Sequence, residues 1–101
     1  MRILVHVKLP VEPFNTYVKD GSASAKMKRI LDDLKPEAAY FMDYGGCRSG
    51  ILIVHMEHTS QIPSIAEPWF LTFNANIEFH PIMLPEDLAK AGLDALGKKW
   101  A

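Results

Sequence analysis

The sequence lacks several features that would point directly to a function. Its 101 residues include a single cysteine, Cys47, so no disulfide can form within the chain. The net charge is −1, with 11 basic and 12 acidic side chains, which excludes the strongly positive surface of a nucleic-acid-binding protein. The richest basic window, Lys26–Arg29, is followed at once by Asp32 and Asp33, as on a solvated helix face.

Long apolar runs and targeting segments are also missing. No run approaches the roughly 18 apolar residues of a membrane span. The first residues are interrupted by His6 and Lys8 and do not resemble a signal peptide. We therefore expect a cytoplasmic protein of bacterial type that binds neither membranes nor nucleic acids. The length and an ordinary hydrophobic share of 49% predict one domain over residues 1–101.

Two periodicities are present, and they predict the secondary structure. Helical three- and four-residue spacings run from Phe14 to Leu34, with an interruption at Gly21, and again after Thr59. A last helix is expected from Pro85. The two-residue alternation of strands occupies four stretches: Arg2–Lys8, Glu37–Tyr44, Ile51–Glu57 and Ala75–Met83.

The order of these elements predicts an α+β fold. A Gly45-Gly46 turn joins the second and third strands as a hairpin. Right-handed crossovers then give an antiparallel four-stranded sheet in the order 4-1-3-2, a ferredoxin-like βαββαβ sandwich with a C-terminal helix. Helices cover only one face of such a sheet, yet the third strand is apolar on both faces. We therefore expect the uncovered face to form a homodimer.

Three runs of sequence carry a resemblance to a known superfamily. Pro36–Phe41, Ala66–Leu71 and His80–Met83 with Glu86–Leu88 resemble small bacterial proteins of unknown function in the dimeric α+β-barrel superfamily. The resemblance covers essentially the whole chain. It implies two ferredoxin-like subunits whose sheets face each other around a shared cavity. Superfamily members include cofactor-free monooxygenases, muconolactone-type isomerases and dehydratases, but none of their catalytic motifs is recognisable here.

The fourth strand carries the main candidate site. Asn76, Glu78 and His80 share one of its faces, and His6 lies on the mixed face of the first strand, its predicted neighbour. Histidine titrates near neutral pH and partial burial raises a glutamate pKa, so His6, Glu78 and His80 are candidate catalytic groups for proton transfer. The alternatives are a polar lining for a ligand or dimer contact, and a plain solvated surface.

Other side chains are candidates for ligand binding. The Tyr40 phenol would orient a ligand in a cavity, and Arg48, just after the turn, would hold a carboxylate with two hydrogen bonds. The more ordinary interpretations are an edge tyrosine and a solvated loop arginine. His55 shares a strand face with Glu57. These two side chains and a histidine from another strand would form a binding site, whereas His58 points away. Asn76 completes the ligand-binding set, and no metal ion or cofactor is predicted.

Two functions remain open from the sequence. The leading hypothesis is a small-molecule-binding protein or cofactor-independent enzyme, with His6 or His80 as the base and Arg48 or Tyr40 as the orienting group. Its substrate would be small and aromatic or carboxylated. The alternative is a non-catalytic dimeric module for interaction or regulation.

Overall fold

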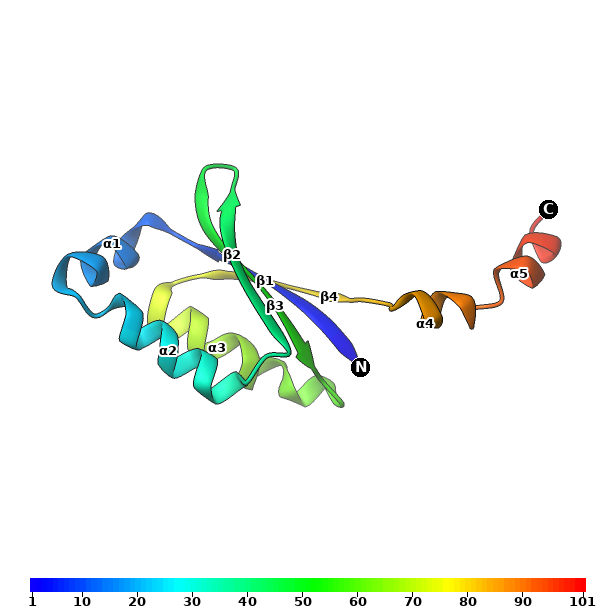
Figure 1. The fold of residues 1–101 in the computed structure, drawn as a ribbon, viewed down its shortest axis with the longest axis horizontal. Coiled ribbons are helices and arrows are strands. Elements are labelled where there is room, and N and C mark those ends of the chain that lie inside the picture. Colours follow the sequence, from blue (N-terminus) through cyan, green and yellow to red (C-terminus); the bar gives the residue numbers. More distant parts are fainter.

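The computed structural model describes residues 1–101 and shows an α+β domain with a projecting C-terminal segment (Figure 1). The four strands are β1 (Arg2–Leu9), β2 (Ala38–Tyr44), β3 (Cys47–His55) and β4 (Asn76–Pro81). The domain's helices are α1 (Val11–Asp20), α2 (Ala23–Leu34) and α3 (Ile62–Phe73), the last preceded by the 3₁₀ turn η1 (Thr59–Gln61). The projecting segment contains α4 (Pro85–Ala89) and α5 (Leu93–Lys99).

The four strands form one antiparallel sheet in the order β2-β3-β1-β4, which confirms the predicted strand order. The central strand β1 pairs with β3 on one side and with β4 on the other. This register sets His6 between Ile51 of β3 and Glu78 of β4. The predicted neighbours, the first and fourth strands, therefore meet with His6 and Glu78 directly opposite each other.

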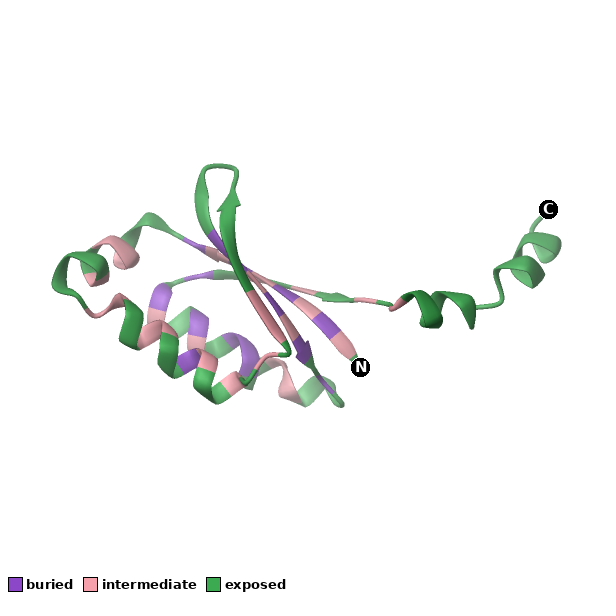
Figure 2. Cartoon of the chain, in the orientation of Figure 1, coloured by how far each residue is buried: buried purple, intermediate pink, exposed green.

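The hydrophobic core lies between one face of the sheet and helices α1, α2 and α3 (Figure 2). Alternate residues of β1 are buried, as the two-residue period requires. Against them pack Trp69 and Phe73, which are one helical turn apart on α3, and Ile30 of α2. The Phe14 ring of α1 lies 5.4 Å from the Phe73 ring. α2 and α3 thus bury residues of their predicted stripes, whereas α1 packs Phe14 and Tyr17 only partly against the core and leaves Val18 exposed.

Residues with positive φ end the three helices of the domain: Gly21 for α1, Lys35 for α2 and Asn74 for α3. Gly21 adopts a φ of 82° and closes α1, so the predicted interruption is a true break between two helices. Pro68 does not shorten α3, which continues through it to Phe73. The expectation of a single C-terminal helix is wrong, because Gly92, with a φ of 72°, separates α4 from α5.

The β2–β3 hairpin is longer than predicted. Gly45 and Gly46 have φ values of 59° and 79°, so they form a two-residue turn of the kind that fits the twist of paired strands. The ladder consequently reaches Tyr44 opposite Cys47, and β3 begins at Cys47 rather than at Ile51. Arg48 is therefore a strand residue and does not belong to a loop.

We call the sheet surface turned away from α1–α3 the open face. Its β2–β3 half is largely apolar, and Tyr40, Met42 and Tyr44 are 64%, 41% and 52% exposed there. Its β1–β4 half is polar. The register assigns to this face the following residues: Arg2, Leu4, His6, Lys8, Ala38, Tyr40, Met42, Tyr44, Cys47, Ser49, Ile51, Ile53, His55, Asn76, Glu78 and His80.

Residues 82–101, here called the C-terminal arm, extend away from the domain (Figure 1). They raise the radius of gyration to 17.1 Å, compared with about 13 Å for a compact chain of this length. The accessible surface is 6991 Å², whereas a compact monomer of this mass exposes about 5,800 Å². None of the helices is both long enough and apolar enough to cross a membrane.

Candidate functional site

Six side chains on the open face make a continuous series of contacts, which we call the polar patch: His6, Lys8, Tyr44, Ser49, Glu78 and His80. They come from all four strands. They share one side of the sheet because paired residues of adjacent strands project to the same face. The patch therefore depends on strand register and not on any loop.

Ser49 fixes the protonation pattern of His6. His6 Nε2 and Ser49 Oγ are 2.6 Å apart, and the Ser49 hydroxyl also donates to the Val7 carbonyl at 3.0 Å. A serine hydroxyl has one proton to donate. When it is used on Val7, the proton between His6 and Ser49 must sit on Nε2. Neutral His6 then carries its free lone pair on Nδ1, the atom able to accept a proton.

Tyr44 links His6 to Lys8 across the sheet. The His6 and Tyr44 rings lie 4.8 Å apart with planes at 74°, an edge-to-face arrangement. Lys8 Nζ lies 5.0 Å from the centre of the same Tyr44 ring, within range of a cation–π interaction. The tyrosine ring therefore restrains both basic side chains over the polar half of the open face.

Glu78 is the acidic member of the polar patch. Its carboxylate lies 3.3 Å from Lys8 Nζ and 3.3 Å from His80 Nε2. Hydrogen bonds from Lys8 and then from His80 lower the pKa of Glu78 below its usual value. The expectation that burial would raise this pKa is wrong for the single chain, because Glu78 is exposed and faces two donors. Glu78 is thus an ionised acceptor near neutral pH.

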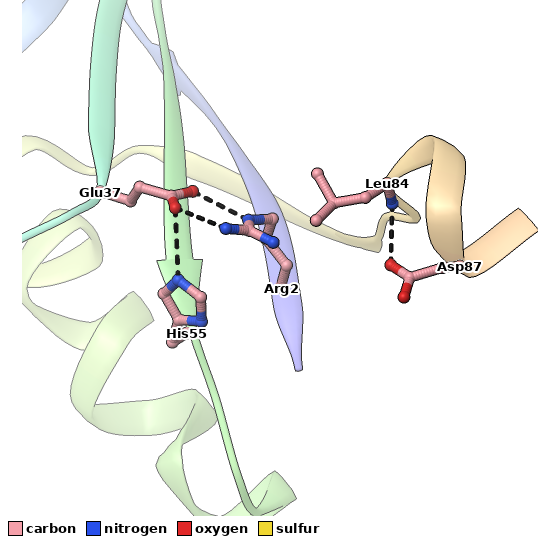
Figure 3. A network of polar contacts seen from close by, with 5 residues as sticks. All are labelled: Arg2, Glu37, His55, Leu84 and Asp87. Atoms are coloured by element: carbon pink, nitrogen blue, oxygen red, sulfur yellow. Dashed lines mark hydrogen bonds and ion pairs between the residues drawn. The ribbon is translucent and has the colours of Figure 1, made fainter.

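A second polar cluster lies at the opposite end of the open face (Figure 3). Arg2 grips Glu37 with two hydrogen bonds, Nε to Oε2 at 2.9 Å and Nη2 to Oε1 at 2.6 Å, and His55 Nε2 lies 3.6 Å from Oε1. The hydrogen bond from Arg2, aided by the charges of Arg2 and His55, lowers the pKa of Glu37 to about 2. This cluster joins the ends of three chain segments, and His55 belongs to it rather than to the polar patch.

Two other predicted ligand-binding residues lie on the open face outside the polar patch. Asn76 stands opposite Lys8 in the β1–β4 register, beside the patch. Tyr40 lies on the edge strand β2, opposite Ile51, and is exposed. Both are positioned to line a space above the sheet.

Arg48 is not part of this surface. It pairs with Leu9 and Asp43 in the sheet and projects toward the helices, where it lies 4.7 Å from the Phe14 ring centre. Its Nη1 donates to Asn15 Oδ1 at 2.7 Å. The prediction that Arg48 orients a substrate beside His6 is therefore wrong, because the two side chains leave opposite faces of the sheet.

Sequence reasoning did not include Lys8 and Ser49 among the candidate site residues, whereas Tyr44 was considered with Tyr40 as a phenol that would orient a ligand. Lys8 shares the parity of His6 on β1, a signal that was present in the alternation. Tyr44 shares the parity of Tyr40 on β2 in the same way. Ser49 carried no such signal, since its place opposite Lys8 follows only from the length of the hairpin.

A groove of about 640 Å³ lies on the helix-covered side of the sheet, and we call it the helix-side groove. It is bounded by α1, α2 and the β2–β3 hairpin. Its lining is mostly apolar and includes Leu9, Phe14, Val18, Met27, Leu31 and Phe41, with the charged Lys28, Asp32 and Arg48; Met42 and Ser49 of the hairpin, assigned above to the open face, also border it. No group of three or more His, Cys, Asp or Glu side chains is placed to hold a metal ion.

Comparisons with known proteins assign no family to the chain. No family model matches the chain, and no curated protein matches it. One solved structure similar to it is the de novo designed protein Ferredog-Diesel, at 8% sequence identity and a TM-score of 0.45. The match covers 80% of this chain and 85% of that one. So distant a likeness assigns no function.

Proposed function

We propose that the chain is a ferredoxin-like subunit that forms a homodimer through its open face and binds a small carboxylated or aromatic molecule over the polar patch. The observation that carries the proposal is the contact series from Ser49 through His6, Tyr44 and Lys8 to Glu78, next to an exposed apolar surface. A second subunit facing this surface would convert it into an enclosed cavity.

The exposed apolar half of the open face supports the dimer. Tyr40, Met42 and Tyr44 lie there without cover from their own chain. Only 15 of the 101 residues are buried, so the core is small and gains from association. An apolar surface of this kind next to polar side chains is typical of an interaction site.

The charges of the polar patch indicate what it would bind. Lys8 and His80 are cationic or hydrogen-donating groups, and Tyr44 supplies an aromatic face. They suit a carboxylate attached to a ring. His6 would act as the base if a reaction occurs, because Nδ1 is its free acceptor, whereas ionised Glu78 would hold Lys8 and His80 in place.

One observation favours the alternative, a non-catalytic dimeric module. Both oxygens of Glu78 already have partners within the chain, Lys8 and His80, so the patch is satisfied without a ligand. In that case the patch would serve only as a polar contact between subunits.

The two proposals are separated by measuring binding and mass on the same variants. Salicylate titrated into ¹⁵N-labelled protein is expected to shift amide resonances of β1 and β4. His6→Ala is expected to weaken this binding about tenfold, equivalent to about 1.4 kcal/mol, while the mass by light scattering stays that of a dimer. His58→Ala, an exposed histidine outside the sheet, is the control and should bind as the parent does.

The opposite result would reject the binding function. One such result is a lower dimer fraction in His6→Ala and His80→Ala with salicylate affinity equal to that of the parent. Another is a lower dimer fraction in both variants when neither the parent nor the variants bind salicylate. In either case the patch is a subunit contact and the non-catalytic module is correct. A chain that stays monomeric at all concentrations would reject both.

A further inference from the structure

The C-terminal arm carries an apolar stripe that no part of its own chain covers. Leu93 and Leu96 lie on one side of α5, and Trp100, the residue that caps its C-terminal end, follows Leu96 by four residues. They are 56%, 45% and 77% exposed. Leu88 of α4 is also exposed, at 46%. Four large apolar side chains on one short segment are costly to leave in water.

The helices of the arm are too short to be stable without a packing surface. α4 has five residues and α5 has seven, whereas isolated helices below about 12–15 residues are marginal in water. Local signals do define α4, since Pro85 begins it and the Asp87 carboxylate accepts from the Leu84 N–H at 2.9 Å (Figure 3). Such caps determine where a helix begins, but they do not supply the stability that tertiary packing gives.

The arm leaves the domain at the end of the sheet that is far from the helix-side groove. Its first residue, Ile82, donates to the Arg2 carbonyl, at the beginning of β1. The groove is lined by Leu9 and Arg48, at the other end of β1. The arm also runs outward from the domain (Figure 1). In one chain, therefore, the exposed apolar stripe of the arm and the helix-side groove lie toward opposite ends of the sheet, so the arm does not fill the groove of its own chain.

We propose that the arm of one chain packs into the helix-side groove of a second copy, with α5 as the inserted element. The two surfaces are both mainly apolar, and the groove wall also carries the charged side chains of Lys28, Asp32 and Arg48. α5 presents its leucines and Trp100 with an acidic residue, Asp94, at its start and Lys98 and Lys99 at its end. Asp94 has the cationic Lys28 and Arg48 available in the groove wall, whereas Asp32 is the one acidic side chain there and is already paired with Lys28.

The surface area agrees with this exchange. The chain exposes about 1,200 Å² more than a compact monomer of its mass. A stable interface buries about 800 Å² on each partner, and two reciprocal arms would cover that area. The inference rests on the proposed homodimer and adds a second contact to it, formed by the arm instead of the open face.

Single-cysteine variants test the exchange in the full-length chain. In a Cys47→Ser background, a chain with Leu96→Cys is mixed with a chain with Val18→Cys, which is half-exposed in the groove. Any disulfide between the two different variants must join two chains. We expect the mixed disulfide dimer to form several-fold more than in a control mixture of Leu96→Cys with Ser64→Cys, an exposed position on α3 outside the groove.

Four outcomes overturn the proposal. One is a mixed-dimer yield no higher than the Ser64→Cys control. Another is an internal disulfide of monomer mass when Leu96→Cys and Val18→Cys are placed in the same chain. A protein that is dimeric by light scattering but gives no groove disulfide rejects the arm exchange alone, whereas a protein that is always monomeric rejects the open-face dimer as well.

A pair of charge substitutions gives an independent readout. Leu96→Glu places a charge in the apolar stripe and is expected to lower the dimer fraction several-fold at micromolar concentration. Ala95→Glu lies on the other side of α5 and should leave the dimer fraction unchanged. Equal behaviour of the two variants would overturn the proposed orientation of α5.

Discussion

At the scale of single residues, Ser49 controls which nitrogen of His6 is protonated. Its side chain is the one buried polar group of the open face, 2% exposed; its hydroxyl lies 2.6 Å from His6 Nε2 and donates to the Val7 carbonyl, which leaves His6 as the donor between the two. A buried hydroxyl with two partners orders the ring beside it. The chemistry of His6 is therefore set by a residue that would itself touch no ligand.

Replacing Ser49 tests this control. Ser49→Ala is expected to lower the free energy of unfolding by about 1 kcal/mol, since a buried hydrogen-bonded hydroxyl is lost. It should also change the ¹⁵N shifts of His6 from a pure Nε2–H pattern to a mixture of tautomers. Ser64→Ala, which removes an exposed hydroxyl bonded to the Gln61 carbonyl, is the matched control. Unchanged His6 shifts in Ser49→Ala would contradict the assignment.

Glu37 makes the stability of the domain depend on pH. Its pKa is lowered from 4.5 to about 2 by Arg2 and, to a smaller degree, by His55. A lowered carboxyl pKa stabilises the folded state above the unfolded-state value and loses this effect as the pH falls toward the folded-state value. The contribution of Glu37 is therefore full above about pH 5 and declines toward pH 2.

Glu37→Gln is expected to lower the Tm by a few degrees at pH 7, and the difference from the parent should shrink as the pH falls from 5 toward 2. Thermal unfolding followed by circular dichroism at several pH values measures it. Glu67→Gln removes an exposed carboxylate of α3 and should show no such trend. A Glu37→Gln difference that is constant over this range would be inconsistent with the ion pair.

At the scale of elements, α3 shows how spacing determines stability. Phe73 is fully buried and contacts Phe14, Tyr17 and Trp69, whereas Phe70, on the same helix, is 40% exposed. The two residues have the same side chain and differ in the side of the helix on which they lie. Helical position, and not residue type, decides their contribution.

Phe73→Ala is expected to reduce the free energy of unfolding by about 3–5 kcal/mol, because it leaves a cavity in the core. Since such domains have only about 5–15 kcal/mol of stability, this loss removes a large share of it. Phe70→Ala should cost less than half as much. Urea denaturation followed by circular dichroism compares them, and equal losses would contradict the observed packing.

The β2–β3 hairpin shows where sequence reasoning succeeded and where it failed. The Gly45-Gly46 turn was recognisable, and the strand order followed from the sequence of elements. The beginning of β3 was not recognisable, because Ser49 and Gly50 have low strand propensity and extend the strand only through pairing with β1 and β2. Arg48 was predicted to lie in a loop but lies in this strand. Its strand position directs its side chain to the helix side of the sheet, away from the candidate site.

The placement of His6 against Glu78 followed from a different kind of information. Alternation along each strand predicted which side chains share a face, and the strand order predicted that β1 and β4 are neighbours. The register between them depends on how far each strand slides along the other, which no local pattern encodes. The structure supplies that register, and with it the contacts of Lys8 and Tyr44.

At the scale of the whole molecule, the open face is the surface on which the proposed dimer depends. Tyr40 stands near the middle of its apolar half and is 64% exposed, while Leu71 of α3, on the helix layer, is 80% exposed. Judged by exposed fraction alone, Leu71 would be the better candidate for a dimer contact. The proposed dimer requires Tyr40, because Tyr40, unlike Leu71, lies on the open face.

Tyr40→Glu is therefore expected to reduce the dimer fraction at least tenfold, since two like charges would be buried near each other. Leu71→Glu should leave it unchanged. Sedimentation equilibrium of both variants measures the effect. A dimer lost in Leu71→Glu and kept in Tyr40→Glu would move the interface to the helix layer.

The two tryptophans occupy the two parts of the molecule that differ most. Trp69 is 1% exposed in the core and Trp100 is 77% exposed in the C-terminal arm. Their fluorescence therefore separates two events: the emission of Trp69 follows the unfolding of the domain, and the emission of Trp100 follows the environment of the arm. Dilution shifts the association between chains but not the folding of a single chain. The change in Trp100 emission over a concentration series therefore reports whether the arm is packed against another chain.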